Sequence, residues 1–523
     1  ALGRHGNDLR PVAEALDRAA ATRNKWDLFH GLAGLHCISG VVQNTRELTE
    51  NEQLKARGFF VETEIEGQAC RAPGPAAKLS ESPWRHFRPA PTKADKAESG
   101  SQSSQKEIES DRQLPLAGIR VLTFTQAWSG TFGTEILSLL GADVVQIEGR
   151  KRPDVWRGNG APVPRAVVNP VIEQSPLNTN GMFNSVNLNK RAITLDMTRP
   201  EGREIFWQML PGFDIVAENF SPKVMASWGI TLESLREVRP DIIFASLSGY
   251  GQEGPLARYP ANGNTMEPMS GFSSINGYNG DSGANTGGLI PDPISGYHFA
   301  GAIMAALHYR QQTGQGQRID LSMMESVASQ LGDRILDYTV NGRIAVPAGN
   351  RHPRIAPHNV YRTGDDRWIA IATEDERQWQ SLAEMIGIDD NRFSSMEKRK
   401  QHEIELDDVI GSWCKARPAE ALESQLITHG VVASVVRGFL DTYRNPPAQL
   451  LERNYLVPVT HPESGTHHMP TMPWVLSQTA TGPVTYSPCF GEHSKEVFRD
   501  ELGMTEDKYN ELEADGITGT TRL

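Results

Sequence analysis

The 523-residue chain has little cysteine: only Cys37, Cys70, Cys414 and Cys489, and no two of them have the spacing of a pair. This argues against a disulfide framework and against a zinc site. No apolar run reaches the roughly 18 residues that a membrane-spanning helix needs. Residues 1–6 lack the apolar core of a signal peptide. We therefore expect a cytoplasmic protein without a metal.

Positive charge is also in short supply. The chain has 52 Lys and Arg against 64 Asp and Glu, a net charge of −12, and a pI of about 5.7. This balance argues against nucleic acid or an anionic membrane as the main partner, because both attract basic surfaces. The hydrophobic content of 38% is ordinary for a globular protein. The length exceeds that of a single core, so we expect two or three domains.

A weak repeat organises the chain around residues 92–113, whose Ser, Lys and Glu content predicts a flexible linker. Three segments before the linker recur 394, 396 and 397 positions later, namely 40–42, 54–60 and 78–80. The steady offset predicts a module of roughly 400 residues, complete at 114–523. Residues 1–91 would be the C-terminal portion of a first module. The first residue is Ala1 rather than Met, which indicates processing or a fragment.

Within the complete module, strand patterns alternate with helical patterns. Strands are expected at 119–124, 142–148, 213–217 and 242–247, and helices at 201–210 and 232–238. Such alternation is typical of an α/β protein with a doubly wound parallel sheet, in which ligands bind at the carboxyl ends of the strands. We expect a large Rossmann-like domain at 114–335, a small α+β domain at 336–455 with a strand at 368–372, and a return to the large domain at 456–523.

Asp292 is the most distinctive candidate for chemistry. It stands between two prolines, after the glycine-rich segment 280–288 and before the small-residue helix expected at 295–309. An exposed carboxylate at this place could attack an acyl centre and carry the acyl group as an anhydride. An Asp before a helix is also a common N-cap. The local sequence leaves both roles open, with the N-cap the commoner one.

Ten segments of the module, taken in order, resemble the family III CoA-transferases, which include carnitine and formyl-CoA transferases and related racemases. The segments are 115–122, 140–148, 183–191, 193–196, 216–222, 246–251, 269–271, 313–317, 349–353 and 491–494. The resemblance implies a Rossmann-like sheet with a smaller α+β domain, in an architecture whose modules interlock. Residues 1–91 resemble the C-terminal portion of the same family.

The resemblance also implies a mechanism and a set of site residues. Asp292 occupies the place of the family's nucleophile, which forms an anhydride with an acyl-CoA and then an aspartyl-CoA thioester. Coenzyme A enters as the acyl-CoA co-substrate, acetyl-CoA being one such donor, and no metal is needed. The residues that the resemblance implies for CoA binding are Leu195, Asn219 and Phe220, of which Phe220 could instead be a core residue. Arg150 and Lys151 belong to a basic cluster that could contact the CoA phosphates or form a solvated turn. The first-module chain or segment would interlock with the second in a dimer or a larger assembly.

Three features narrow the substrate. Residues 254–270 contain no His, which disfavours the racemase branch because its reaction needs an acid and a base. Trp128, Trp156 and Tyr297 are candidates for an aromatic cage around an onium cation, although Trp128, in a strand-to-helix turn, could equally fill the core. The tandem layout resembles that of dimethylsulfoniopropionate (DMSP) CoA-transferase/lyases, which transfer CoA to DMSP and then eliminate dimethyl sulfide to give 3-hydroxypropionyl-CoA.

Several points stay open at this level. Glu267 and Glu325 are guesses for the base of the elimination. Transfer of CoA to carnitine, a betaine or another carboxylate without elimination is the first alternative. A non-catalytic CoA-binding subunit is an alternative of another class, and a buried Asp292 away from any site would favour it.

Overall fold

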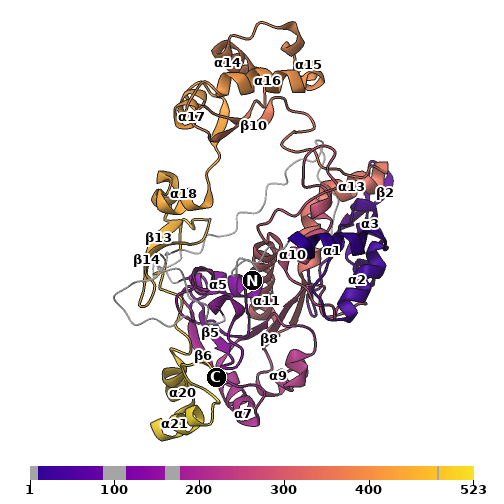
Figure 1. Cartoon of the computed structure of the whole chain (residues 1–523). Coiled ribbons are helices and arrows are strands. Elements are labelled where there is room, and N and C mark those ends of the chain that lie inside the picture. The colour runs from indigo at the N-terminus through magenta and orange to yellow at the C-terminus, as the bar shows by residue number, and fades with distance from the viewer. Residues whose placement is uncertain (1–9, 86–113, 159–176, 480–481) are drawn as a thin grey trace, which may run out of the picture. The chain divides into compact units, whose positions relative to one another are not determined.

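The computed structural model describes residues 10–85, 114–158, 177–479 and 482–523. The chain forms two compact units. The first unit comprises Ala1–Ser273, Asn285–Ala345 and Leu451–Leu523, and the second comprises Ser274–Ala284 and Val346–Leu450 (Figure 1). The linker expected at 92–113 lies outside the described residues. No helix in the described part of the chain is long and apolar enough to span a membrane.

A seven-stranded sheet forms the centre of the first unit. In spatial order its strands are β3 (Ala77–Leu79), β9 (Arg318–Ser322), β8 (Ile243–Ser248), β7 (Ile215–Glu218), β4 (Arg120–Thr123), β5 (Asp143–Glu148) and β6 (Arg191–Thr194). All neighbouring pairs are parallel except β3 and β9. The predicted parallel α/β sheet is confirmed. The sequence did not predict that a strand from before the linker would form its antiparallel edge.

The strands form where the sequence places unbroken apolar runs, because parallel strands are covered on both faces. All six residues of β8 and all four of β7 are buried. Helices α7 (Pro200–Met209) and α9 (Leu232–Val238) follow the predicted bounds closely. Side chains of α20 (Ser494–Leu502) and α21 (Glu506–Ala514) complete the core over one part of this sheet.

Two helices cross closely in the first unit: α5 (Ser129–Leu139) and α11 (Pro291–Thr313). Glycines make this approach possible. A Cβ on Gly296 would lie 2.8 Å from the Phe132 ring and 2.9 Å from the Ser129 carbonyl oxygen, and a Cβ on Gly133 would lie 3.0 Å from the Gly296 carbonyl oxygen. The small-residue helix predicted at 295–309 is therefore present, but it begins at Pro291.

The segment before the linker packs on the first unit. It contains α1 (Arg10–Ala21), α2 (Lys25–Gly34), α3 (Thr45–Glu50), α4 (Glu52–Ala56) and the hairpin of β1 (Phe60–Ile65) and β2 (Gln68–Pro73). The Arg57 guanidinium is fully buried and donates to Asp320 and Glu325, each at 2.7 Å. This charge-assisted cluster and the β3–β9 pairing fix the segment to the sheet.

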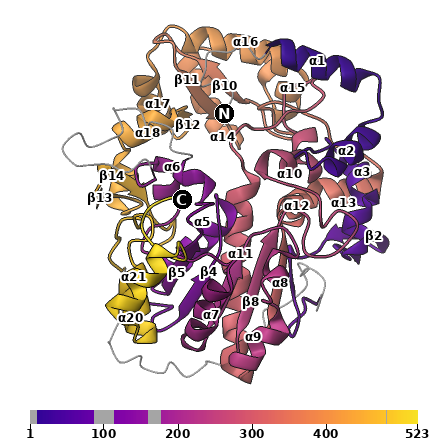
Figure 2. The ribbon, with the colours of Figure 1, turned by 60° about the horizontal axis from the view of Figure 1, so that its bottom comes forward.

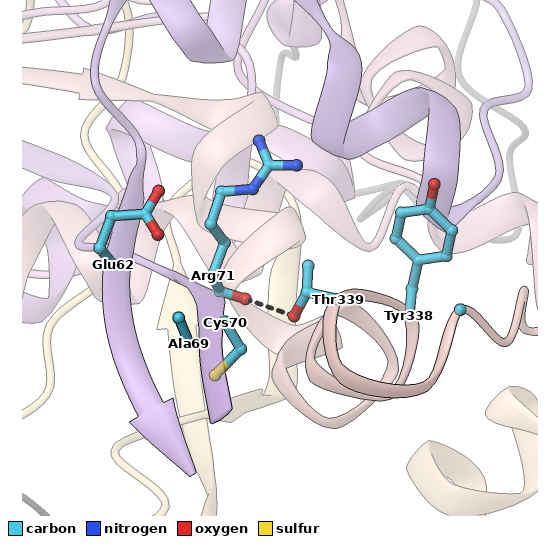
Figure 3. A pocket seen from close by; sticks show the side chains of 7 residues that line it. Glu62, Ala69, Cys70, Arg71, Tyr338 and Thr339 are labelled. Carbon is cyan, nitrogen blue, oxygen red and sulfur yellow. Dashed lines mark hydrogen bonds between the residues drawn. The ribbon is translucent and has the colours of Figure 1, made fainter. Parts of the chain in front are cut away.

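The hairpin lies against α13 (Gly332–Asn341) (Figures 1 and 2). A cavity of about 370 Å³ remains between them, lined by Glu62, Cys70, Arg71 and Tyr338 among others. The Thr339 hydroxyl closes one side by donating to the Arg71 carbonyl oxygen at 3.0 Å (Figure 3). None of the residues predicted from the sequence to take part in catalysis or binding lines this cavity.

The second unit is a small α+β fold. Its antiparallel sheet has the order β10 (His358–Arg362), β11 (Trp368–Ala372) and β12 (Val432–Val435), and the strand predicted at 368–372 is found with the same bounds. Its core is formed with α14 (Glu376–Ile386), α16 (Glu403–Cys414) and α17 (Ala419–Thr428). The chain then forms α18 (Phe439–Arg444) and α19 (Ala448–Glu452) before the hairpin of β13 (Leu456–His461) and β14 (Gly465–Pro470).

Candidate active site

Asp292 lies where α11 begins to cross α5. It is in the first turn of α11, whose N-cap is Ile290, so the N-cap role considered from the sequence is wrong. Its carboxylate instead accepts hydrogen bonds from the backbone N–H and the hydroxyl of Ser129, the first residue of α5. The residue is 9% exposed, so the expected open exposure is also wrong. The site places a carboxylate at a helix N-terminus, where negative charge is favoured.

The surroundings make this carboxylate less stable when charged. Burial raises the pKa of Asp292 to about 6, and the two hydrogen bonds from Ser129 oppose that shift only in part. At neutral pH the group is ionised yet poorly solvated. A carboxylate in that state is a better nucleophile than one in water, and it can expel a thiolate from a thioester.

A glycine leaves room beside the carboxylate. Gly263 begins α10 (Gly263–Met269), and a Cβ added to it would collide with Oδ2 of Asp292. Any larger residue would therefore displace the carboxylate. Local sequence gave no signal for this position, because Gly263 stands in a stretch that predicts only irregular structure.

The loop that joins β4 to α5 is held from both sides. The Asn219 side-chain amide accepts from the Gln126 N–H at 2.7 Å and donates to the Gln126 carbonyl oxygen at 2.8 Å. The Asp154 carboxylate accepts from the N–H groups of Ala127 at 3.0 Å and Trp156 at 2.8 Å. These contacts fix the residues that precede Ser129.

The predicted aromatic residues form two groups rather than one. The rings of Trp128 and Trp156 lie 5.4 Å apart and are tilted by 50°. Tyr297 contacts Phe132 at 5.1 Å and Trp474 at 6.2 Å. Phe132 stands four residues after Trp128, so helical spacing could have indicated it, whereas no local signal marks Trp474. Trp128 directly precedes Ser129, whose N–H and hydroxyl bind Asp292, so the tryptophan pair is connected to the carboxylate through Ser129.

The structure gives three of the five predicted CoA-binding residues another role. Arg150 is buried and donates to the carbonyl oxygens of Thr518 and Thr521 at 2.6 and 2.7 Å, so it holds the C-terminal segment rather than a phosphate. The Leu195 side chain is buried in the core. Asn219 uses its amide oxygen and one amide N–H on the Gln126 backbone, which leaves its second N–H for another acceptor.

Two of the five retain a surface that a nucleotide could contact. Phe220 is half-buried and meets Trp228 edge-on at 5.8 Å, which leaves part of its ring uncovered. Lys151 has a side chain that is 65% exposed and lies 3.2 Å from Asp196. An exposed ion pair of this kind exchanges partners easily, so the ammonium group remains available to a phosphate.

Both guesses for the base of an elimination are tied to other groups. Glu267 is fully buried and accepts from the N–H and hydroxyl of Thr286 at 2.6 and 3.0 Å, which fixes the loop before Asp292. Glu325 uses both carboxylate oxygens to bind the Arg57 guanidinium. Across the described ranges no group of three His, Cys, Asp or Glu side chains is arranged to hold a metal.

Comparisons of the sequence and of the structure with known proteins identify one family. The model of the family described as CoA-transferase family III matches residues 116–494. The succinyl-CoA–D-citramalate CoA-transferase of Chloroflexus aurantiacus is 30% identical over 406 residues, which cover 76% of this chain and 97% of that protein. The formyl-CoA:oxalate CoA-transferase of Streptomyces avermitilis is 28% identical over 423 residues, covering 77% and 99%. The crystal structure of a CAIB/BAIF family protein from Brucella suis matches with a TM-score of 0.67 at 26% identity, covering 74% of this chain and 100% of that one.

Proposed function

The chain belongs to CoA-transferase family III and is an enzyme that uses CoA thioesters, and from this premise we propose that Asp292 is its nucleophile. The supporting observation is the position of the carboxylate. It is buried at the crossing of α5 and α11, has a raised pKa, and is held by two hydrogen bonds from Ser129. A subunit that only bound CoA would have no use for a desolvated carboxylate in this position.

The transfer proceeds through exchanges of one acyl bond for another. Asp292 attacks the thioester carbonyl, the C–S bond breaks, and CoA leaves as the thiolate. The thiolate then attacks the aspartyl carbonyl of the anhydride, which releases the donor carboxylate and leaves an aspartyl-CoA thioester. The acceptor carboxylate attacks this thioester to form a second anhydride, and CoA thiolate attacks the acceptor's acyl carbon to give the new acyl-CoA and free Asp292. Each intermediate keeps an activated acyl bond.

The acceptor that we propose is a carboxylate with an onium group, DMSP in particular, with acetyl-CoA as the donor. Trp128 and Trp156 meet at an angle next to Ser129, and aromatic faces bind onium cations well. Arg157, the nearest basic residue to Trp156 in the sequence, is fully buried and paired with Glu148 at 2.8 Å. Arg157 is therefore not free to bind the second carboxylate of a dicarboxylic acid.

On DMSP a second reaction follows transfer. The new thioester acidifies the α-position, a base removes the α-proton, and dimethyl sulfide leaves to give an acryloyl thioester. Addition of water yields 3-hydroxypropionyl-CoA. Neither Glu267 nor Glu325 is free to be that base, since Thr286 and Arg57 occupy them.

Transfer without elimination is the second candidate. Carnitine and betaines carry the same kind of cation and suit the same tryptophan pair. Citramalate and oxalate, which appear in the names of two relatives, are dicarboxylates without an onium group. Carboxylates of that kind should therefore also be tested as acceptors. Release of dimethyl sulfide separates these candidates.

We also propose that residues 1–91 are the end of a first module. The elements α1, α2, α3, α4, β1 and β2 have 12, 10, 6, 5, 6 and 6 residues, and α16, α17, α18, α19, β13 and β14 have the same six lengths in the same order. Arg57 corresponds to Arg453, and Gly58 and Asn454 after them both have a left-handed backbone, with φ of 62° and 54°.

The repeat supports interlocking with a second sheet of the same kind. In the first copy, Lys78 and Leu79 belong to β3, which pairs with β9. Their counterparts 397 positions later, Val475 and Leu476, are 64% and 46% exposed. We expect these exposed residues and Arg453 to complete the sheet of a partner module, in a dimer or a larger assembly. Analytical ultracentrifugation of Arg453→Ala tests this, with loss of the assembly as the expected result.

The experiment that tests the function is mass spectrometry of the protein after mixing with acetyl-CoA and DMSP, with headspace analysis of dimethyl sulfide. The wild type should carry an adduct on Asp292 and release the sulfide, and Asp292→Asn should do neither. An adduct without sulfide would retain the transferase and reject DMSP as a substrate that is cleaved. The absence of an adduct with acetyl-, succinyl- and formyl-CoA would contradict the nucleophile assignment.

A further inference from the structure

The β4–α5 loop, residues 126–128, adopts a conformation that its own sequence does not favour. Ala127 has φ of +60°, the left-handed region, where a residue with a Cβ is disfavoured relative to glycine. Such a conformation persists only where surrounding contacts enforce it. The loop is therefore a place to look for residues whose role is to hold it.

The first contact comes from the strand on one side of β4. Asn219 follows β7, and its amide oxygen and nitrogen bind the N–H and the carbonyl oxygen of the same residue, Gln126. Both backbone groups of Gln126 are thus fixed by one side chain. Gln126 can neither shift along the strand direction nor rotate without breaking a hydrogen bond.

The second contact comes from the strand on the other side. Asp154 follows β5, is 1% exposed, and donates its own N–H to Glu148 at 3.0 Å. One carboxylate oxygen accepts from the Ala127 N–H, and the other accepts from the Trp156 N–H. A single buried carboxylate therefore joins the left-handed residue of the loop to the segment that carries the second tryptophan.

These two contacts act on the groups next to the nucleophile. Ser129, which binds Asp292, is two residues after Ala127, and Trp128 stands between them. We propose that Asn219 and Asp154 form a two-sided clamp on the loop that positions the Trp128–Trp156 pair and the Ser129 donors relative to Asp292. The catalytic part of this inference rests on the proposed function of Asp292. Both are positioning residues, since they act through the loop.

The clamp has a predictable consequence for specificity. Asp292 keeps its own place on α11 when the loop loosens, so formation of the acyl adduct should persist, although more slowly. The tryptophan pair should lose its fixed geometry, so preference for an onium acceptor should fall most. A residue that only stabilised the fold would lower the amount of active enzyme and leave this preference unchanged.

The test compares Asp154→Asn, Asn219→Asp and the double variant with the wild type. Each single change keeps the side-chain shape and removes one of the two hydrogen bonds. Asp154→Asn leaves one oxygen for the N–H groups of Ala127 and Trp156, and Asn219→Asp leaves no donor for the Gln126 carbonyl oxygen. Asp365→Asn is the matched control, because Asp365 also accepts from a backbone N–H, that of Ala419, in the other unit. We measure hydrogen exchange of peptides covering 124–132 and adduct formation at Asp292. We also compare KM for DMSP with KM for 4-methylpentanoate, an isostere with a CH group in place of the sulfonium.

We expect exchange in 124–132 to rise about ten-fold or more in each single variant, since each loses one part-buried hydrogen bond that holds the loop. The preference for DMSP over 4-methylpentanoate should fall by a similar factor, and the two substitutions should be non-additive because they act on one loop. Unchanged exchange would overturn the clamp, and raised exchange with an unchanged preference would overturn its role at the site. If wild type forms no adduct, the nucleophile assignment fails, whereas the exchange data still decide on the clamp.

Discussion

Replacement of Asp292 by Asn should remove activity and at the same time stabilise the protein. The carboxylate is 9% exposed, and burial raises its pKa to about 6 from the ordinary value of 3.8. The folded state therefore disfavours the charged form. Asn has the same shape, can still accept a hydrogen bond from Ser129, and carries no charge to desolvate.

The magnitude follows from the pKa shift. A shift of about two pH units corresponds to about 3 kcal/mol at 1.36 kcal/mol per unit. Because the folded pKa is the higher one, the folded state binds more protons between pH 4 and 6, and stability falls as the pH rises through that window. The cost is present in full above pH 7 and absent below pH 4. Allowing about 1 kcal/mol for a poorer hydrogen bond, Asn should stabilise the protein by about 2 kcal/mol at pH 7.5.

Denaturant unfolding at pH 7.5 and pH 4 measures this difference. We expect a higher midpoint for Asp292→Asn at pH 7.5 and a slightly lower one at pH 4, where only the poorer hydrogen bond remains, with adduct formation reduced by at least about a thousand-fold. In the wild type, adduct formation should rise with pH through about 6, because the nucleophile must be ionised. Asp333→Asn is the control: Asp333 is an exposed first-turn residue of α13, and its loss should lower stability slightly at both pH values. Equal or lower stability of Asp292→Asn at pH 7.5 would refute the desolvated nucleophile.

Four further substitutions test other parts of the structure. Trp128→Leu and Trp156→Leu should each raise KM for onium acceptors about ten-fold and change KM for 4-methylpentanoate little, as steady-state kinetics would show; equal effects on both acceptors would exclude recognition of the cation. Arg57→Met should destabilise the protein by about 3–5 kcal/mol in denaturant unfolding, because Asp320 and Glu325 would stay buried without their partner. Arg150→Ala should lower the melting temperature and leave KM for acyl-CoA unchanged, since its guanidinium holds the carbonyl oxygens of Thr518 and Thr521. A higher KM with an unchanged melting temperature would instead support a contact between Arg150 and a CoA phosphate.

The sequence predicted the parts of the fold that depend on local pattern. Helix α9 has the predicted bounds, strand β11 has them too, and the parallel sheet follows from runs of buried residues such as those of β8. The family was predicted from motifs in order, and the match to residues 116–494 confirms it. These predictions succeeded for one reason: helix and strand bounds and sequence motifs depend on residues that are close together in the chain.

The errors share the opposite cause, because each concerns which distant groups meet. Arg150 reads as a free basic residue, but the C-terminal segment, more than 360 positions away, supplies carbonyl oxygens that engage it. Asn219 reads as a ligand contact, and no local signal showed that its amide would also bind the backbone of Gln126. Asp292 reads as the N-cap of its own helix, but it lies inside the first turn of α11 and its carboxylate accepts from Ser129 of α5. A buried backbone N–H without a hydrogen-bond partner destabilises the folded state, so loop N–H groups recruit nearby polar side chains. In a protein with a parallel sheet, a polar side chain should therefore be assigned to a ligand only after the hydrogen bonds of the neighbouring loop backbones have been accounted for.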